Sequence, residues 1–263
     1  MRIGLIGNHQ GLAGRLADAG IEVCVHPART TNPVGLDRRE LTCVDSYEAL
    51  AAATEHPRLV LLDLPLGPMI DQTIDEAYVV MEPGDVVLDP SGSYWGDTLR
   101  RFRRMRHRSL FYVDLALIGD IPDGAILVSG DARGVRLCLP LLDRLALPGS
   151  VVQAGGAGAA HYALMVREAV AVAVTHALSE ARQLLEAYPN EPEPDAVADQ
   201  LWPEPPSPGA RATWLLDDAI RLQAAIPLLA QGVMLEIGAA LDEQRVEEPA
   251  LRVGTFVHPD DIL

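Results

Sequence analysis

The chain contains no lysine: its 21 basic residues are all arginine, and 37 acidic residues give it a formal net charge of -16. Without lysine, no reaction can use a lysine amine as its general base. The excess of acid also argues against a general nucleic-acid-binding surface, because phosphate contacts need clustered cations. One basic run, RRFRRMRHR at 100–108, is interpreted as a solvated helix face that balances nearby acidic residues.

Cysteine and long uninterrupted apolar runs are scarce as well. Cys24, Cys43 and Cys138 are widely spaced and odd in number, so we expect reduced thiols and neither a metal site nor a redox pair. No signal peptide or transmembrane segment is visible, and we expect a cytoplasmic protein without a membrane partner. Hydrophobic residues nevertheless make up 49% of the 263 residues, enough for one large domain or two smaller ones.

Short apolar runs alternate with helical patterns in the first half of the chain. The runs that predict strands lie at 1–7, 21–25, 59–65, 86–93, 110–117, 125–131 and 150–155. Helical patterns between them predict an α/β fold with a parallel, doubly wound sheet of the Rossmann type. In such sheets, ligands bind at the carboxyl ends of the strands.

The first unit has the order strand, glycine turn, helix, strand, which opens a dinucleotide-binding βαβ unit. Its turn consists of Gly7, Asn8, His9, Gln10 and Gly11, which we predict as cofactor contacts. His9 replaces the second glycine of the usual fingerprint, and the turn is one residue shorter than GxGxxG. The turn alone therefore fits nucleotide binding and a merely structural role equally well.

A single arginine follows the second predicted strand. Arg29 stands where such a unit carries either an acid for the ribose 2′-hydroxyl or an arginine for the 2′-phosphate of NADP. No acid occupies this place. We therefore favour NADP as the cofactor over the alternative that Arg29 is an ordinary loop arginine.

The second half of the chain is helical in pattern. Residues at about 158–187 are apolar nearly all round, which predicts a buried helix. The segment 188–210 is rich in proline and acid and predicts a loop, and a second apolar helical region follows at about 211–241. Because a helical domain this short cannot cover both apolar regions, we expect a homodimer through the C-terminal helices.

Several stretches, in chain order, resemble 6-phosphogluconate dehydrogenase and its β-hydroxyacid dehydrogenase relatives. They are MRIGLIG at 1–7, LPLG at 64–67, EPGDVVLDPSGSYWGDTLRR at 82–101, VSGD at 128–131, GAGAAHYALMV at 156–166 and SPGARATWLLDDAIRLQAAIPLLAQGV at 207–233. The resemblance implies an NADP-binding Rossmann domain at 1–152 and a shortened all-helical domain at 153–263 for substrate binding and dimerisation. It adds Leu64, Pro65 and Ser91 to the predicted cofactor contacts.

The resemblance also implies chemistry that this chain lacks. The family's long helix carries a lysine general base in the pattern H-F-x-K-M-V-x-N, where this chain reads HYALMVRE. Leu164 therefore holds the lysine position and Glu168 the asparagine position. The family's S-G-G is replaced by IGD at 118–120, its D-G-G-N-S by DPSGS at 89–93, and a middle section of the helical domain is missing around 203–207. Because leucine cannot take a proton, we expect no ordinary oxidation of 6-phosphogluconate.

Two functions remain open at this point. The chain is either a different NADP-dependent oxidoreductase or a catalytically inactive relative that serves as a binding or assembly protein. In the first case His161 and Glu168 share a helix face and supply acid–base chemistry, while Arg167 holds an anionic small-molecule substrate. The alternative is structural: Arg167 and Glu168 pair with other charges across a helical interface. The sequence names no substrate for either function.

Overall fold

The computed structural model of the chain describes residues 1–28, 38–186, 213–216, 219, 226, 227, 229–235 and 237. Arg29, the predicted loop at 188–210 and most of the second helical region lie outside these residues. Contacts divide the chain into two compact units, Met1–Val166 and Arg167–Leu263. The division falls inside the long helix α6 (Ala159–Glu186), whereas the boundary expected from the sequence precedes that helix.

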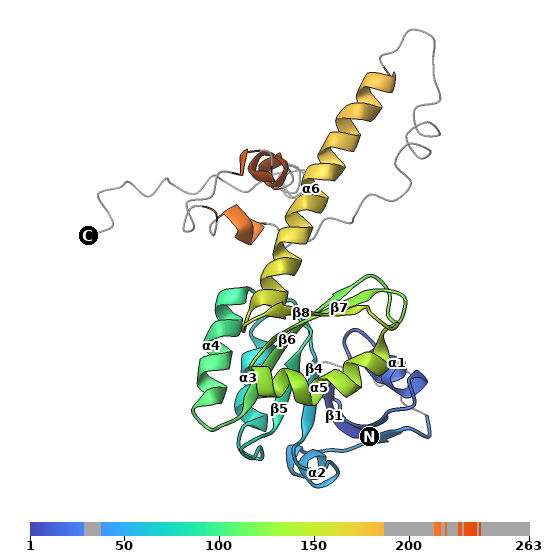
Figure 1. The fold of residues 1–263 in the computed structure, drawn as a ribbon, viewed down its shortest axis with the longest axis vertical. Helices are drawn as coiled ribbons and strands as arrows, with labels where there is room; N and C mark the ends of the chain where they lie inside the picture. Colours follow the sequence, from blue (N-terminus) through green and yellow to red (C-terminus); the bar gives the residue numbers. More distant parts are fainter. Residues whose placement is uncertain are drawn as a thin grey trace, which may run out of the picture. The chain divides into compact units, whose positions relative to one another are not determined.

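The first unit is an eight-stranded sheet with helices on both faces (Figure 1). The strands are β1 (Arg2–Gly7), β2 (Glu22–His26), β3 (Leu41–Cys43), β4 (Leu59–Asp63), β5 (Val86–Asp89), β6 (Phe111–Ile118), β7 (Ala125–Gly130) and β8 (Val151–Gly155). Their spatial order is β3-β2-β1-β4-β5-β6-β7-β8. The first six of these strands have the order of a Rossmann sheet, which confirms the predicted fold class.

One strand departs from the predicted parallel sheet. β7 pairs antiparallel with β6, while every other neighbouring pair is parallel. The reason is the connection: only residues 119–124 lie between β6 and β7. A parallel crossover needs a dozen or more residues, so this short link can only make a hairpin.

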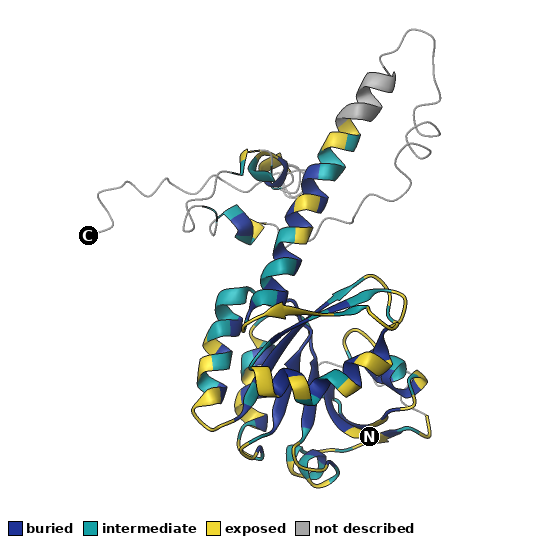
Figure 2. Ribbon diagram, viewed as in Figure 1, coloured by how far each residue is buried: buried dark blue, intermediate teal, exposed yellow. Residues whose placement is uncertain are grey.

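Two buried apolar clusters hold the helices to the sheet. The helices of this unit are α1 (Leu12–Asp18), α2 (Tyr47–Ala52), α3 (Met69–Ala77), α4 (Trp95–Arg106) and α5 (Ala132–Leu145). One cluster packs α1 and α5 on one face, and the other packs α2, α3 and α4 on the opposite face. Figure 2 shows the central strands buried along their length, as expected of strands covered on both faces.

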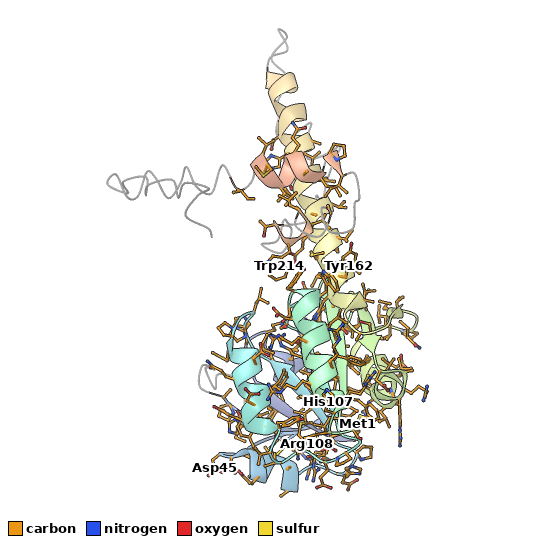
Figure 3. The ribbon with its side chains drawn as sticks, turned by 90° about the vertical axis from the view of Figure 1, so that its left-hand side faces the viewer. Met1, Asp45, His107, Arg108, Tyr162 and Trp214 are labelled. Carbon is orange, nitrogen blue, oxygen red and sulfur yellow. The ribbon has the colours of Figure 1, made fainter. Side chains whose placement is uncertain are left out.

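Helix α4 carries the basic run, and its arginines pair with acids of α3. Arg100 and Arg101 both bind Asp71, and Arg104 pairs with Asp75. The expected balance of local acid is confirmed, but the run is not solvated throughout, because Arg101 is buried. At the start of α4, Trp95 meets Tyr162 of α6 edge to face, with 5.9 Å between ring centroids, and His107 and Arg108 follow the opposite end of the helix (Figure 3).

Helix α6 agrees closely with the predicted span of 158–187. In the second unit its side chains at Ala169, Ala171 and Val172 are buried, as the apolar pattern predicts. Residues 229–235 are helical, and a Cβ at Gly232 would lie 3.0 Å from the Cα of Ala173, so the two helical backbones approach closely there. Among the described residues, no helix is long and apolar enough to cross a membrane.

Replacing Gly134 by alanine separates packing from helix propensity. A glycine-to-alanine change inside a helix stabilises by about 0.5–1 kcal/mol when space allows. A Cβ at Gly134 in α5 would lie 2.7 Å from the Cβ of Phe111 on β6. We therefore expect Gly134→Ala to lower the free energy of unfolding by about 1–3 kcal/mol in urea titrations.

The matched control is Gly14→Ala in α1, where a Cβ would meet nothing within 4 Å. This variant is expected to gain stability. Equal shifts of the unfolding midpoint in the two variants would contradict the close contact of α5 with β6.

Candidate functional site

Three neighbouring strands carry a buried aspartate toward the carboxyl edge of the sheet. Asp63 ends β4, Asp89 ends β5, and Asp114 lies opposite Asp89 in the β5–β6 register. All three side chains are fully buried. A buried carboxylate is costly unless hydrogen bonds satisfy it, so the segments that follow these strands must supply donors.

Asp63 binds the glycine turn that follows β1. Its Oδ1 accepts the backbone N–H of Gln10 at 2.6 Å and its Oδ2 accepts that of Leu12 at 2.9 Å. Its backbone oxygen accepts the N–H of His9 at 2.9 Å. The turn is thus fixed against the end of β4, with the side chains of His9 and Gln10 exposed.

Asp114 holds the start of α6 in the same way. Its carboxylate accepts the backbone N–H groups of Gly158, Ala160 and His161 at 2.9, 3.2 and 3.3 Å, and Ser129 donates its hydroxyl at 2.6 Å. These are donors that a helix N-terminus leaves without intrahelical partners. A charge inside β6 therefore fixes where α6 begins.

Asp89 belongs to a side-chain network beneath the loop at 90–93. Tyr112 donates its hydroxyl to Oδ2 at 2.5 Å, Ser91 donates its N–H to Oδ1 at 2.9 Å, and Arg101 lies 3.5 Å away. Burial alone would raise the pKa of Asp89, but the positive fields of His161 and Arg101 and these hydrogen bonds lower it. Burial and the neighbouring carboxylate raise the pKa of Tyr112 well above its ordinary value.

His161 connects α6 to β5 and α4. Its Nε2 lies 3.0 Å from the backbone oxygen of Asp89, and its Nδ1 lies 2.7 Å from the hydroxyl of Thr98. Because a carbonyl oxygen only accepts, Nε2 carries a proton. Both ring nitrogens are engaged and the ring is buried. The structure thus gives His161 a positioning role, and its predicted catalytic role stays a prediction.

The other residues of the predicted catalytic face differ in their environment. Leu164 is buried in an apolar cluster with Ala116 of β6 and Ala160. In the second unit Glu168 is buried and Arg167 is exposed, so the two side chains lie on different faces of α6. Their catalytic and substrate-binding roles stay predictions.

The predicted cofactor contacts of the first unit converge on one edge. The glycine turn, Leu64, Pro65 and Ser91 follow β1, β4 and β5, which are neighbours in the sheet. Gln10 donates from Nε2 to the backbone oxygen of Pro90 at 3.4 Å, which links the turn to the loop after β5. Ser91 is buried, and its hydroxyl lies 2.7 Å from that of Ser93. Arg29 lies outside the described residues.

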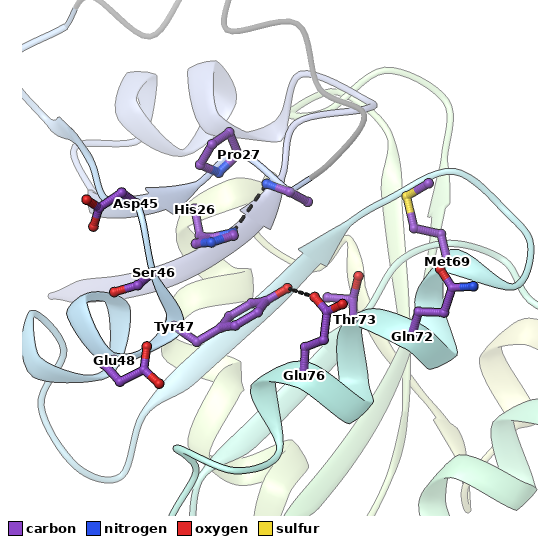
Figure 4. Close-up of a pocket in the computed structure, with 11 residues that line it drawn as sticks. His26, Pro27, Asp45, Ser46, Tyr47, Glu48, Met69, Gln72, Thr73 and Glu76 are labelled. Atoms are coloured by element: carbon purple, nitrogen blue, oxygen red, sulfur yellow. Dashed lines mark hydrogen bonds between the residues drawn. The ribbon is translucent and has the colours of Figure 1, made fainter.

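A cavity of about 530 Å³ lies at the carboxyl ends of β2 and β3 (Figure 4). His26 stacks on Tyr47 with 4.4 Å between ring centroids, and the Tyr47 hydroxyl donates to Glu76 at 3.0 Å. The remaining lining residues are Pro27, Ala28, Asp45, Ser46, Glu48, Met69, Gln72 and Thr73. Its volume lies within the range of small-molecule sites. Over the described ranges, no cluster of His, Cys, Asp and Glu could hold a metal ion.

Sequence reasoning missed the three buried aspartates, although the sequence contains a signal for them. Each interrupts an apolar strand pattern, in VLLD at 60–63, VVLD at 86–89 and YVD at 112–114. A charge within a strand that is otherwise fully apolar indicates a buried group with dedicated partners. Which N–H groups serve as partners follows only from the fold, because they are 44 to 53 residues away for Asp63 and Asp114.

Known proteins resemble the chain in sequence and in fold. Residues 2–156 match the family model of the NAD binding domain of 6-phosphogluconate dehydrogenase. The decarboxylating 6-phosphogluconate dehydrogenase of Chlamydia pneumoniae is 28% identical over 205 residues, covering 71% of this chain and 42% of that enzyme. The chain spans less than half the length of the first curated relatives that it matches.

Two solved structures share the fold. The 3-hydroxyisobutyrate dehydrogenase of Mycobacterium tuberculosis has a TM-score of 0.73 and 18% identity, over 92% of this chain and 94% of that chain. The 6-phosphogluconate dehydrogenase of Plasmodium falciparum has a TM-score of 0.76 and 15% identity, over 99% of this chain and 67% of that chain.

Asp71 binds two arginines of α4, Arg100 and Arg101, and these contacts predict a pH-dependent contribution to stability. Burial would raise its pKa, but hydrogen bonds from Arg101 and Arg100 lower it from 3.8 to about 2. A lowered pKa stabilises the fold above about pH 4, and this contribution is lost as pH falls toward 2. We expect Asp71→Asn to remove about 2 kcal/mol at neutral pH and to flatten the acid limb between pH 4 and 2 in urea unfolding.

Asp97→Asn is the matched control, because Asp97 is more exposed and pairs with Arg100 alone among the described residues. Asp97→Asn also removes one negative charge, but we expect a much smaller loss in the free energy of unfolding. An unchanged acid limb in Asp71→Asn would contradict the network.

Proposed function

The chain belongs to the 6-phosphogluconate dehydrogenase family, and we propose that it binds NADP without performing the lysine-dependent alcohol oxidation that its family resemblance implies. The observation that carries this proposal is Leu164. The resemblance assigns the general base to this position, and the side chain there is buried against Ala116 and Ala160. The whole chain contains no lysine that could act from another position.

The missing base matters because oxidation of a secondary alcohol by hydride transfer also releases the hydroxyl proton. A general base with a pKa near neutral pH must accept this proton. An alkyl side chain cannot do this. The replaced segment 118–120 lies where β6 turns toward β7, so the substrate clamp that the resemblance assigns there is altered as well.

The described residues suit the adenosine part of NADP but not its pyrophosphate. The cavity at β2 and β3 has the size and the aromatic ring for an adenosine moiety, and the Plasmodium falciparum relative was solved in complex with NADP+. Asp45, Glu48 and Glu76 line this cavity, so a 2′-phosphate there requires a compensating cation, for which Arg29 is the candidate. At the pyrophosphate position the donors of the glycine turn already bind Asp63.

The engagement of the turn donors by Asp63 favours a second function, that of a catalytically inactive binding or assembly protein. A chain whose dinucleotide turn is satisfied internally also suits a catalytically inactive relative that binds or assembles with other molecules. A remodelled oxidoreductase would instead rely on Glu168, Arg167 and His161 for an anionic substrate. Homodimerisation through the C-terminal helices is compatible with both functions and stays a proposal.

The choice of cofactor is tested by fluorescence titration with NADPH and NADH. We expect tighter binding of NADPH, and Arg29→Ala should weaken NADPH about tenfold while leaving NADH little changed, because only NADPH carries the 2′-phosphate. Arg2→Ala is the matched control, since Arg2 pairs with Glu22 at the start of β1. A preference of the unmodified protein for NADH would overturn the assignment, and no binding of either would favour the second function.

The missing activity is tested by following NADP reduction with 6-phosphogluconate. We expect no turnover by the unmodified protein or by the Leu164→Lys, Glu168→Asn double variant. A general base contributes roughly 10²–10⁴-fold, and lost substrate positioning can cost roughly 7–11 kcal/mol. Leu164→Met controls for repacking. Turnover by the double variant on the order of 10 per second would mean that the rest of the site is intact.

A further inference from the structure

Five backbone N–H groups between β1 and the first turn of α1, those of residues 9–13, have an acceptor within the chain. Those of His9, Gln10 and Leu12 bind the backbone oxygen and both carboxylate oxygens of Asp63. The N–H of Gly11 points to the backbone oxygen of Asn8 at 3.4 Å, and that of Ala13 to the Asn8 side-chain oxygen at 3.3 Å. These five donors of the short turn are therefore already engaged within the protein.

In dinucleotide-binding folds, these N–H groups are the ones that hold the pyrophosphate, at the junction of the glycine turn and the first helix. A carboxylate resembles a phosphate in the features that matter there. It is an anion with two acceptor oxygens, and charge-assisted hydrogen bonds to it are short and strong. The 2.6 Å contact of Asp63 with Gln10 is of that kind.

We propose that Asp63 is an internal competitor for the pyrophosphate of the dinucleotide: its carboxylate occupies the donors of the turn, and a dinucleotide binds there only by displacing it. This inference rests on the proposed function, because it assumes that the turn can meet a dinucleotide. It makes Asp63 the residue that limits cofactor affinity in this chain.

The geometry around Gly7 holds the competitor in place. Gly7 pairs with Asp63 in the β1–β4 register and has a φ of 87°, and a Cβ there would collide with the backbone oxygen of Asp63. Only glycine lets the turn come this close to β4. The turn therefore lies directly against the end of β4, where the Asp63 carboxylate reaches the N–H groups of Gln10 and Leu12.

The charges that face Asp63 are few. His9 on the turn and Arg15 on α1 act on its carboxylate, and Arg15 also lies 3.6 Å from Asp120. Burial raises the pKa of Asp63 more than its hydrogen bonds and these two side chains lower it. The carboxylate is therefore held mainly by backbone donors, the same donors that a pyrophosphate needs, and not by a separate ion pair.

The test compares NADPH binding by the unmodified protein and by Asp63→Asn in fluorescence titrations, with the melting temperature of each protein recorded. Removing the charge leaves one acceptor oxygen and frees one donor of the turn. We expect NADPH to bind about tenfold or more tightly to Asp63→Asn. Asp63→Val, which suits a buried strand and frees both donors, is the second variant in case the first fails to fold.

Asp85→Asn is the matched control. Asp85 is equally buried and accepts the backbone N–H groups of Arg58 and Glu82, but it precedes β5 at the opposite edge of the sheet. It should lose stability without gaining affinity. If the unmodified protein binds NADPH and a folded Asp63 variant binds it equally or less tightly, the inference is wrong while the proposed function stands. If neither the unmodified protein nor a folded Asp63 variant binds NADPH, both fail.

Discussion

Buried carboxylates at the carboxyl edge of the sheet are the constraint on which the rest of the first unit depends. Asp63, Asp89 and Asp114 lie on three adjacent strands and are fully buried. None of them can remain charged there without several donors. The glycine turn, the loop after β5 and the start of α6 supply those donors, so the backbone at this edge takes its shape from the need to satisfy three side chains.

The same constraint limits what the edge can do. In a ligand-binding sheet of this type, the turn and helix ends at the carboxyl edge keep N–H groups for an anionic ligand. Here the glycine turn and the start of α6 already donate N–H groups to carboxylates of the protein itself. The turn donates to Asp63 and the start of α6 donates to Asp114. Leu164 adds a buried apolar contact to Ala116 of β6 at this edge. If Asp63 competes for the donors of the turn as proposed, the affinity of this edge for a dinucleotide depends on displacing its carboxylate.

The sequence predicts most of the fold because apolar runs and glycine or proline stops are local signals. The strands at 1–7, 59–65 and 150–155 and the long helix all appear near their predicted places. The predicted strand at 86–93 ends early at Asp89, because Pro90 has no N–H for the sheet. The direction of β7 depends on a link too short for a crossover, and the three-residue β3 is too short to leave a pattern.

The site is less predictable, because its chemistry depends on contacts between distant residues. The turn was identified from its glycines, but its occupant, Asp63, comes from a strand 53 residues later. The binding of the turn by Asp63 is tested most directly by amide hydrogen exchange of Gln10 and Leu12 in the protein without nucleotide. We expect both amides to exchange as slowly as those of β1 and to lose that protection in Asp63→Val. Exchange of these two amides at the rate of an unstructured peptide in the unmodified protein would contradict the central claim that Asp63 occupies the turn.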